Sequence, residues 1–191
     1  MKKSLLLFLV CLLGCVTYVN AQYVQERPSC EYMLKIEAGY MPYVTNVLDK
    51  SENGFLLPNQ EHAANINILN GMNISQDFFL GLGLGYAYMA PIKDIANGCH
   101  NGLAFVDMDY RPLNDEWAPM LGARVGGSIM LESGIYSTTL TPYVEVYGGI
   151  NYYYRHVYRN MERNNHAWFA ELGVAYMFKT IFVPIRIGFR L

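Results

Sequence analysis

Apolar and polar or small residues alternate with a period of two along most of this chain. Between Phe79 and Met89, leucines and tyrosines at even positions alternate with glycines and one alanine at odd positions. The stretches 140–154 and 181–191 show the same alternation, with aliphatic residues on one face. Because successive side chains of a β-strand point to opposite faces, this pattern predicts strands.

Eight segments carry the pattern, and each is about ten residues long or longer. A strand in a soluble protein has typically about five or six residues, whereas a tilted transmembrane strand needs about 9–11. The lengths therefore favour an all-β fold, an eight-stranded antiparallel up-and-down transmembrane β-barrel. The predicted strands span residues 31–41, 62–73, 79–89, 102–111, 117–131, 140–154, 167–178 and 181–191.

The composition of the two strand faces predicts which one meets lipid. One face is rich in Leu, Ile and Val, with aromatic residues toward the strand ends, whereas the other is largely Gly, Ala, Asn and Tyr. A water-facing surface would be rich in charged and hydroxyl residues, and small residues suit the narrow interior of a barrel. We therefore expect an outward apolar band between two aromatic girdles. The expected girdle residues are Tyr32, Tyr40, Tyr86, Tyr88, Tyr110, Trp117, Tyr152, Tyr154, Trp168, Tyr176, Phe178 and Phe189.

Composition excludes two broad classes of protein. Of the 191 residues, 52% are hydrophobic and only 16% are charged, which is the opposite of a disordered chain. The formal net charge of −2 and the lack of a basic stripe argue against nucleic-acid binding.

The N-terminus has the features of a secretory signal peptide. Two early lysines precede a short apolar stretch over 5–13, and small residues precede a cleavage site after Ala21. The exported domain would then be residues 22–191, without internal boundaries. The segment Leu12-Leu13-Gly14-Cys15 resembles a lipobox, so lipidation of Cys15 is the alternative.

Three segments carry a resemblance to a known family. Residues 78–86 (FFLGLGLGY), 106–111 (VDMDYR) and 117–126, which begins with WAP, resemble strands three to five of small outer-membrane β-barrel proteins from Bacteroidetes. The resemblance implies an OmpA- or OmpX-like, porin-like barrel in the outer membrane. It also implies contact with outer-membrane lipid and lipopolysaccharide, insertion by the barrel-assembly machinery, and no cofactor or catalytic residue.

Ten charged residues fall on the expected inner face. Because an unpaired buried charge is costly, we expect them to form an ion-pair network that fills the lumen. Asp107 and Asp109 point the same way and could form a hydrolytic pair, but Arg111 on the same face would hold nearby carboxylates ionised. The network residues are Lys35, Glu37, Asp107, Asp109, Arg111, Arg124, Glu145, Glu171, Arg186 and Arg190.

Other candidate chemistry is weaker. The spacing of Gly81, Gly83 and Gly85 does not fit a dinucleotide-binding loop, and the cysteines lack metal-ligand spacing. We expect no disulfide between Cys30 and Cys99, since the apolar band is about 25 Å tall and a disulfide spans at most about 7 Å between Cα atoms.

The sequence therefore predicts a non-enzymatic outer-membrane barrel with a structural or surface-interaction role and no open pore. Loops 44–61 and 91–101 would present a surface to an unknown ligand. Two alternatives remain: an outer-membrane enzyme that hydrolyses lipid A or peptides, and a secreted soluble barrel that binds an apolar ligand. The soluble barrel requires Leu80, Leu82 and Leu84 to face inward.

Overall fold

The computed structural model describes residues 31–46, 60–75, 77–91, 98–111, 117–132, 140–153, 166–178 and 180–191. Within these ranges no helix is long and apolar enough to cross a membrane. The predicted signal peptide, Cys15, Cys30, Tyr154 and most of loops 44–61 and 91–101 lie outside the described residues.

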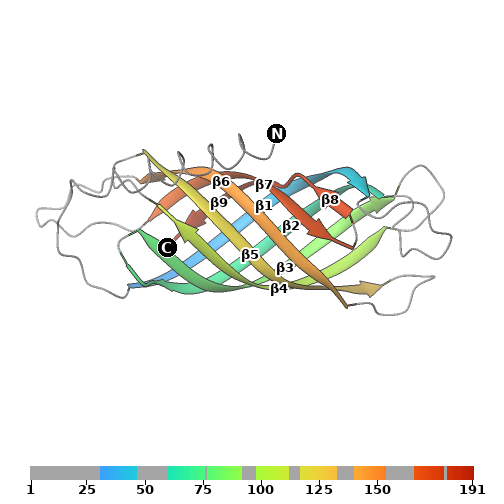
Figure 1. Cartoon of the computed structure of the whole chain (residues 1–191), viewed down its shortest axis with the longest axis horizontal. Helices are drawn as coiled ribbons and strands as arrows, with labels where there is room; N and C mark the ends of the chain where they lie inside the picture. The colour runs from blue at the N-terminus through green and yellow to red at the C-terminus, as the bar shows by residue number, and fades with distance from the viewer. Residues whose placement is uncertain are drawn as a thin grey trace, which may run out of the picture.

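The described residues form one closed antiparallel sheet (Figure 1). Its strands are β1 (Glu31–Asn46), β2 (Gln60–Asn73), β3 (Phe78–Pro91), β4 (Cys99–Tyr110), β5 (Trp117–Glu132), β6 (Leu140–Tyr153), β7 (Ala167–Met177), β8 (Thr180–Phe182) and β9 (Ile185–Arg190). Each strand from β1 to β7 pairs with the next one in sequence. Both β8 and β9 pair with β7 on one side and β1 on the other.

β8 and β9 therefore share one position in the wall, so the nine strands make an eight-stranded barrel as predicted. The interruption falls at Val183 and Pro184, and proline has no N–H to donate to the ladder. Two backbone hydrogen bonds keep the interrupted strand in place: the N–H of Val183 donates to Pro42 O (3.0 Å), and that of Gly173 donates to Pro184 O (2.9 Å).

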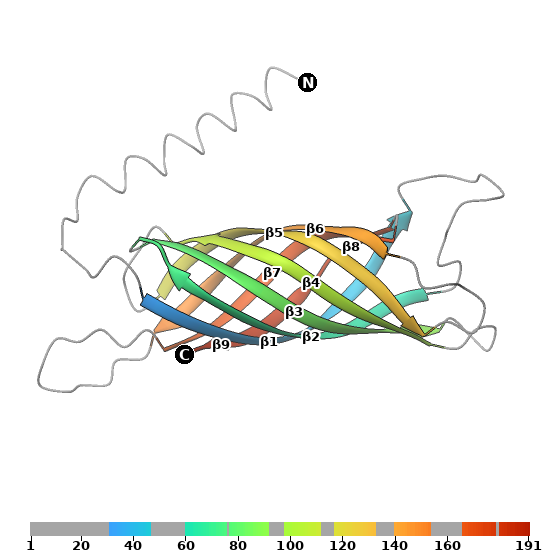
Figure 2. The same ribbon diagram turned by 90° about the horizontal axis from the view of Figure 1, so that it is seen from below.

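The register of the strands sets the tilt of the barrel. A path of paired residues can be followed from strand to strand around the sheet. It starts at Met33 on β1 and comes back to β1 at Tyr43, ten residues further along the strand. With about 3.3 Å per residue and about 4.8 Å between strands, this offset over eight strands gives a tilt of about 40°. Figure 2 shows that the strands run obliquely to the long axis of the barrel. A barrel of this size has an interior that side chains fill.

The two ends of the barrel can be told apart by the chain termini. The first residue of β1, Glu31, and the last residue, Leu191, lie at one end, where Leu34 and Leu191 exchange backbone hydrogen bonds of 2.9 and 3.1 Å. We call this the terminal end and the opposite one the distal end. The connection between Tyr153 and Ala167 starts and finishes at the terminal end, because these two residues pair and Ala167 also pairs with Arg190.

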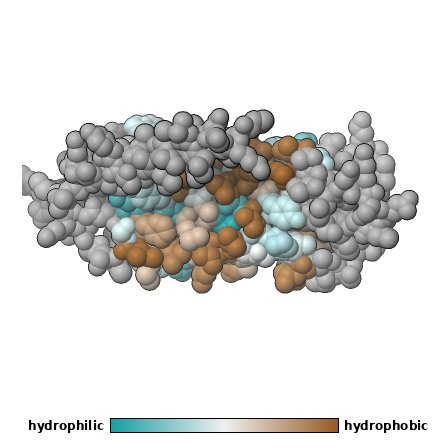
Figure 3. All heavy atoms as spheres, viewed as in Figure 1, coloured by the Kyte–Doolittle hydropathy of each residue, from teal (hydrophilic) through white to brown (hydrophobic). Residues whose placement is uncertain are grey.

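Apolar side chains cover the outside of the wall. Leu82 and Leu84 are 69% and 71% exposed, whereas the intervening Gly83 faces the ring of Phe105 inside. On the face shown in Figure 3, apolar side chains gather along the middle of the barrel. The outward orientation of Leu82 and Leu84 contradicts the alternative hypothesis of a secreted soluble barrel, because that hypothesis requires them to face inward.

Most inward side chains of the distal half of the lumen are also apolar, which the sequence analysis did not predict. Inward residues from the distal ends of the strands, including Met41, Met89, Met130, Met177 and Phe182, pack into one buried cluster. We call this the distal apolar cluster. The assignment of Phe178 to the aromatic girdle is wrong: its ring belongs to this cluster and is 2% exposed. The β7–β8 turn gives Phe178 a φ of 52°, which breaks the alternation and turns the side chain inward.

Candidate functional site

All ten predicted network residues lie inside the barrel. Each of them is at most 5% exposed, and five acidic side chains face five basic ones. They form two groups of ion pairs, one in the middle of the lumen and one nearer the terminal end. Alternation in the strands explains the placement, because every one of these residues shares its face with the inward glycines and alanines.

Arg124 on β5 is the centre of the first group. Its Nη2 lies 2.9 Å from Glu37 Oε2, its Nη1 2.8 Å from Glu171 Oε1, and its Nε 3.2 Å from Asp107 Oδ1. Nη1 also lies 3.5 Å from Oε1 of Glu145. The guanidinium therefore meets carboxylates from four strands, β1, β4, β6 and β7, and it stacks over the Tyr147 ring at 4.3 Å.

Arg186 on β9 completes the central group from the other side. It pairs with both oxygens of Glu145, with Nη2 2.9 Å from Oε2, and its Nη1 lies 3.1 Å from Glu171 Oε1. Its Nε lies 3.6 Å from Glu37. The three glutamates are thus shared between two arginines, which satisfies buried carboxylates that would otherwise be strongly destabilising.

The second group lies nearer the terminal end. Lys35 Nζ donates to Asp107 Oδ2 at 2.7 Å and also to Asp109. Asp109 is paired in addition with Arg190 (3.2 Å) and with Arg111 (3.0 Å). Because Asp107 contacts both Lys35 and Arg124, the two groups form one continuous network through the lumen.

Uncharged polar residues that sequence reasoning did not select complete this network. The Tyr147 hydroxyl donates to Asp107 at 2.7 Å, that of Tyr143 donates to Glu145, and the Asn67 amide donates to Glu37 at 2.6 Å. At the terminal end, Arg111 donates to Asn73 and, at 3.3 Å, to Tyr153. These residues share the inward phase of the charged ones, so polarity combined with strand phase was the signal that could have identified them.

This arrangement favours a structural role for the charged residues over a catalytic one. Asp107 and Asp109 are both engaged by basic side chains, and neither is exposed to solvent. A hydrolytic pair needs room for substrate and water beside the carboxylates. Among the described residues, no group of three His, Cys, Asp or Glu side chains could hold a metal ion.

Aromatic residues surround the outside of the terminal end. Trp117 packs against Tyr152 with ring centroids 4.6 Å apart, and Trp168 packs against Phe189 at 5.0 Å. The members of this terminal-end ring come from β1, β4, β5, β6, β7 and β9. They are Tyr32, Tyr110, Trp117, Tyr152, Trp168 and Phe189.

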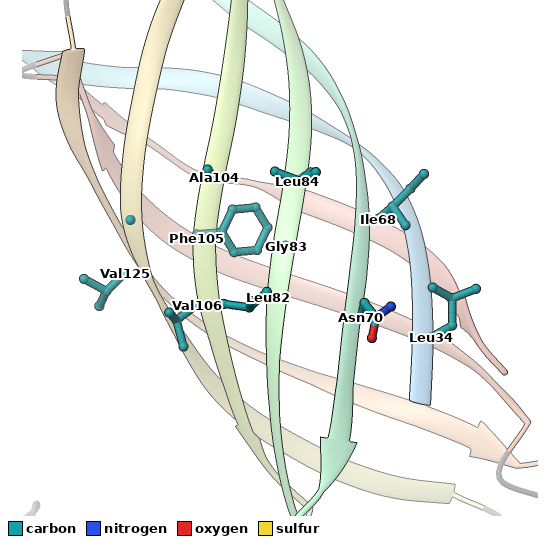
Figure 4. Close-up of a pocket in the computed structure, with 11 residues that line it drawn as sticks. Leu34, Ile68, Asn70, Leu82, Gly83, Leu84, Ala104, Phe105, Val106 and Val125 are labelled. Atoms are coloured by element: carbon teal, nitrogen blue, oxygen red, sulfur yellow. The ribbon is translucent and has the colours of Figure 1, made fainter. Parts of the chain in front are cut away.

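The aromatic residues of the distal end are distributed unevenly. Tyr40, Tyr86 and Tyr88 lie on β1 and β3, and His62 and His100 lie beside them on β2 and β4. On β5 to β9, Tyr176 is the described outward aromatic residue at this end. On the terminal side of these tyrosines, a shallow apolar groove runs over the outer wall of β1 to β5 (Figure 4).

Comparison with known proteins identifies the fold. Neisserial surface protein A (NspA) aligns at 15% identity with a TM-score of 0.54, covering 87% of this chain and 99% of NspA. The N-terminal β-barrel domain of Pseudomonas aeruginosa OprF aligns at 17% identity with a TM-score of 0.49, covering 83% and 97%. Ail, the attachment invasion locus protein of Yersinia pestis, aligns at 13% identity with a TM-score of 0.39, covering 84% and 99%.

The likeness to NspA shows that this chain has the fold of an eight-stranded transmembrane β-barrel. No protein-family model matches the chain, and no curated protein sequence is similar to it.

Proposed function

We propose that this protein is a small outer-membrane β-barrel with a closed lumen and a structural or surface-interaction role. One observation carries the proposal: the chain has an apolar outside and a charged inside. Leu84 is 71% exposed on the outer wall, while Arg124 on the inner wall is fully buried. In water, this exposed apolar wall would drive aggregation, whereas in a bilayer it meets lipid.

The closed sheet supports the same location. In hydrocarbon every backbone N–H and C=O must be paired within the protein, and only helices and closed barrels achieve this. Pairing of β8 and β9 with β1 closes the sheet, leaving no unpaired edge among the described strands. The predicted signal peptide and the resemblance to Bacteroidetes barrels support export to an outer membrane.

The lumen is the basis for proposing a closed barrel rather than a pore. The ion-pair network fills the middle of the lumen, and the distal apolar cluster fills the part of the lumen between the network and the distal end. Ions would have to displace paired charges and then pass between apolar side chains. A barrel of eight strands leaves little space beyond that of its own side chains.

We further propose that the role is interaction and not catalysis. The carboxylates that could act as acid or base are held in ion pairs inside the lumen. The predicted partners are outer-membrane lipid, lipopolysaccharide and the barrel-assembly machinery, with loops 44–61 and 91–101 as the surface for a further ligand. Lipid A or peptide hydrolysis would require a site in those loops.

The test is the migration of the mature protein on a gel, with and without boiling, after folding in detergent. A closed detergent-stable barrel should run faster unboiled than boiled, and the cellular protein should fractionate with the outer membrane. A protein that shows no shift and appears in the soluble fraction would contradict the proposal. The variant Val106→Pro, in the middle of the β4 ladder, is the control that should lose the shift.

A further inference from the structure

One side of the distal end carries a patch of tyrosine and histidine rings. Tyr40, Ala64, Tyr88 and His100 form one continuous row of paired residues across β1 to β4. Ala64 separates the two tyrosines, so their backbone positions lie two strand spacings, or about 10 Å, apart. We call the five outward rings at the distal ends of these strands, Tyr40, His62, Tyr86, Tyr88 and His100, the ring patch.

The rings of this patch contact one another and remain accessible. Tyr40 stacks on His62 with ring centroids 5.5 Å apart, and Tyr88 lies 5.1 Å from His100. The Tyr86 hydroxyl is hydrogen-bonded to His100 Nδ1. Tyr40, Tyr86 and Tyr88 are 47%, 40% and 36% exposed. The patch therefore presents ring faces together with hydroxyl and imidazole groups.

A bilayer girdle alone does not explain this distribution. The terminal-end ring draws residues from six strands around the barrel, as interfacial anchoring predicts. At the distal end, outward positions on the opposite wall are mainly aliphatic, such as Leu140 on β6 and Ile181 on β8, with Tyr176 on β7. Among the described residues, this cluster of rings at the distal end is confined to one wall, which favours one specific occupant over general anchoring in the bilayer.

The groove lies on the same wall, directly next to the patch. Tyr86 and Leu84 are consecutive outward residues of β3, so on this strand the patch borders the groove. Figure 4 shows Leu82, Leu84 and Ile68 among the residues that outline it, with the short side chain of Ala104 beside Leu84. Its lining is apolar apart from Asn70. An occupant that fits both parts has a polar head and long apolar chains.

We propose that this wall binds one glycolipid, with its acyl chains in the groove and its sugar head on the ring patch. The proposal rests on the proposed membrane location. Tyrosine rings pack against the C–H faces of sugars, and their hydroxyls together with imidazole exchange hydrogen bonds with sugar hydroxyls. Among the described outward residues of β1 to β4 there is no Lys or Arg to neutralise a phosphate. The patch chemistry thus favours a neutral, hydroxyl-rich head over an anionic one.

The experiment compares two lipids that differ only in the head group. The purified barrel is inserted into phosphatidylethanolamine vesicles containing equal amounts of a diglycosyl diacylglycerol and a phosphatidylglycerol with the same acyl chains. Lipids retained after extraction are counted by native mass spectrometry. The wild type should retain one glycolipid in preference to phosphatidylglycerol by about tenfold, the effect of a stacking contact plus a hydrogen bond.

Matched variants locate the site. The double variant Tyr88→Ala/His100→Ala should lose the preference for the sugar head, and Ala104→Phe should lower retention of both lipids by filling the groove. Tyr176→Ala removes a tyrosine from the opposite wall and should leave retention unchanged. Equal retention of the two lipids by the wild type would overturn the proposal. An equal loss of glycolipid from Tyr176→Ala and from the double variant Tyr88→Ala/His100→Ala would also overturn it.

The same preparation separates this proposal from the one on which it rests. Insertion is measured by heat-dependent gel migration before lipids are counted. A wild type that fails to insert contradicts the membrane barrel itself. A wild type that inserts but retains the glycolipid no better than phosphatidylglycerol contradicts only the glycolipid site.

Discussion

The guanidinium of Arg124 on β5 and the carboxylate of Glu37 on β1 lie 2.9 Å apart, although 87 residues separate them in sequence. Their strands are not neighbours in the sheet, so the contact crosses the lumen. The backbone ladders connect each strand only to its neighbours. The ion pairs therefore join opposite walls, and their geometry depends on the closed barrel.

Replacing Arg124 should be strongly destabilising. Arg124→Met keeps the side-chain length but removes the one cation that Glu37, Glu171 and Asp107 all contact. The expected loss is about 3–5 kcal/mol in the free energy of unfolding, the cost of breaking a buried pair from one side. Urea titration of the barrel in vesicles, followed by tryptophan fluorescence, measures it.

A double-mutant cycle shows whether the loss comes from the pairing. Glu37→Gln combined with Arg124→Met should cost less than the two single changes added together, since the carboxylate that lost its nearest cation is gone. A cost for Arg124→Met below about 1 kcal/mol, in the range of exposed pairs, would contradict a desolvated network.

Two glycines should respond in opposite ways to the same substitution. A Cβ at Gly126 would meet the backbone oxygen of Ala104 and lie 2.5 Å from Phe105 Cα, so Gly126→Ala should cost about 1–3 kcal/mol. At the outward Gly148 the nearest atom, Met120 O, is 3.7 Å away. Gly148→Ala should therefore leave the urea midpoint unchanged or slightly raised. Equal effects of the two changes would contradict the inward and outward assignment.

The lumen should not conduct ions. Purified protein inserted in a planar bilayer should give no current steps above the lipid baseline, because paired charges and the distal apolar cluster occupy the interior. Protein inactivated by boiling is the control for leaks caused by detergent. Stable, reproducible channel openings by the folded barrel would contradict the filled lumen.

Cys30 and Cys99, the two cysteines that follow the predicted signal peptide, should behave as separate thiols. Cys99 begins β4 at the distal end and is 3% exposed, whereas residue 31, next to Cys30, begins β1 at the terminal end. We expect maleimide to label both thiols after unfolding without reductant, and Cys99 only slowly in the folded barrel. Mass spectrometry counts the labels, and Cys99→Ser serves as the control. A cross-linked pair would show that the strand phase is wrong.

Strand number and strand faces could be predicted because they depend on local alternation. The outward Leu82 and Leu84 and the inward Arg124 and Glu37 follow from the period of two and from the choice of lipid for the apolar face. Which carboxylate meets which base could not be predicted. Those pairs depend on the ten-residue offset around the barrel, and no local pattern reveals that offset.

The distal half of the lumen shows where alternation fails as a signal. Met41, Met89, Met130 and Met177 are apolar on the inner face, so both faces of the strand ends are apolar and composition no longer separates them. Phe178 was misassigned for a related reason: a positive φ in a tight turn ends the alternation one residue early. The break at Pro184 was missed because proline fits the inward phase of the pattern.

The most direct test of the account is the cost of placing an arginine at successive outward positions of β3. Leu80→Arg, Leu82→Arg, Leu84→Arg and Tyr88→Arg are compared by urea titration in vesicles. If the wall spans a bilayer, the cost should reach about 2–4 kcal/mol at Leu82 and Leu84 and fall to about 0–1 kcal/mol near the interfaces. A small and uniform cost at all four positions would show that water, and not lipid, covers the wall.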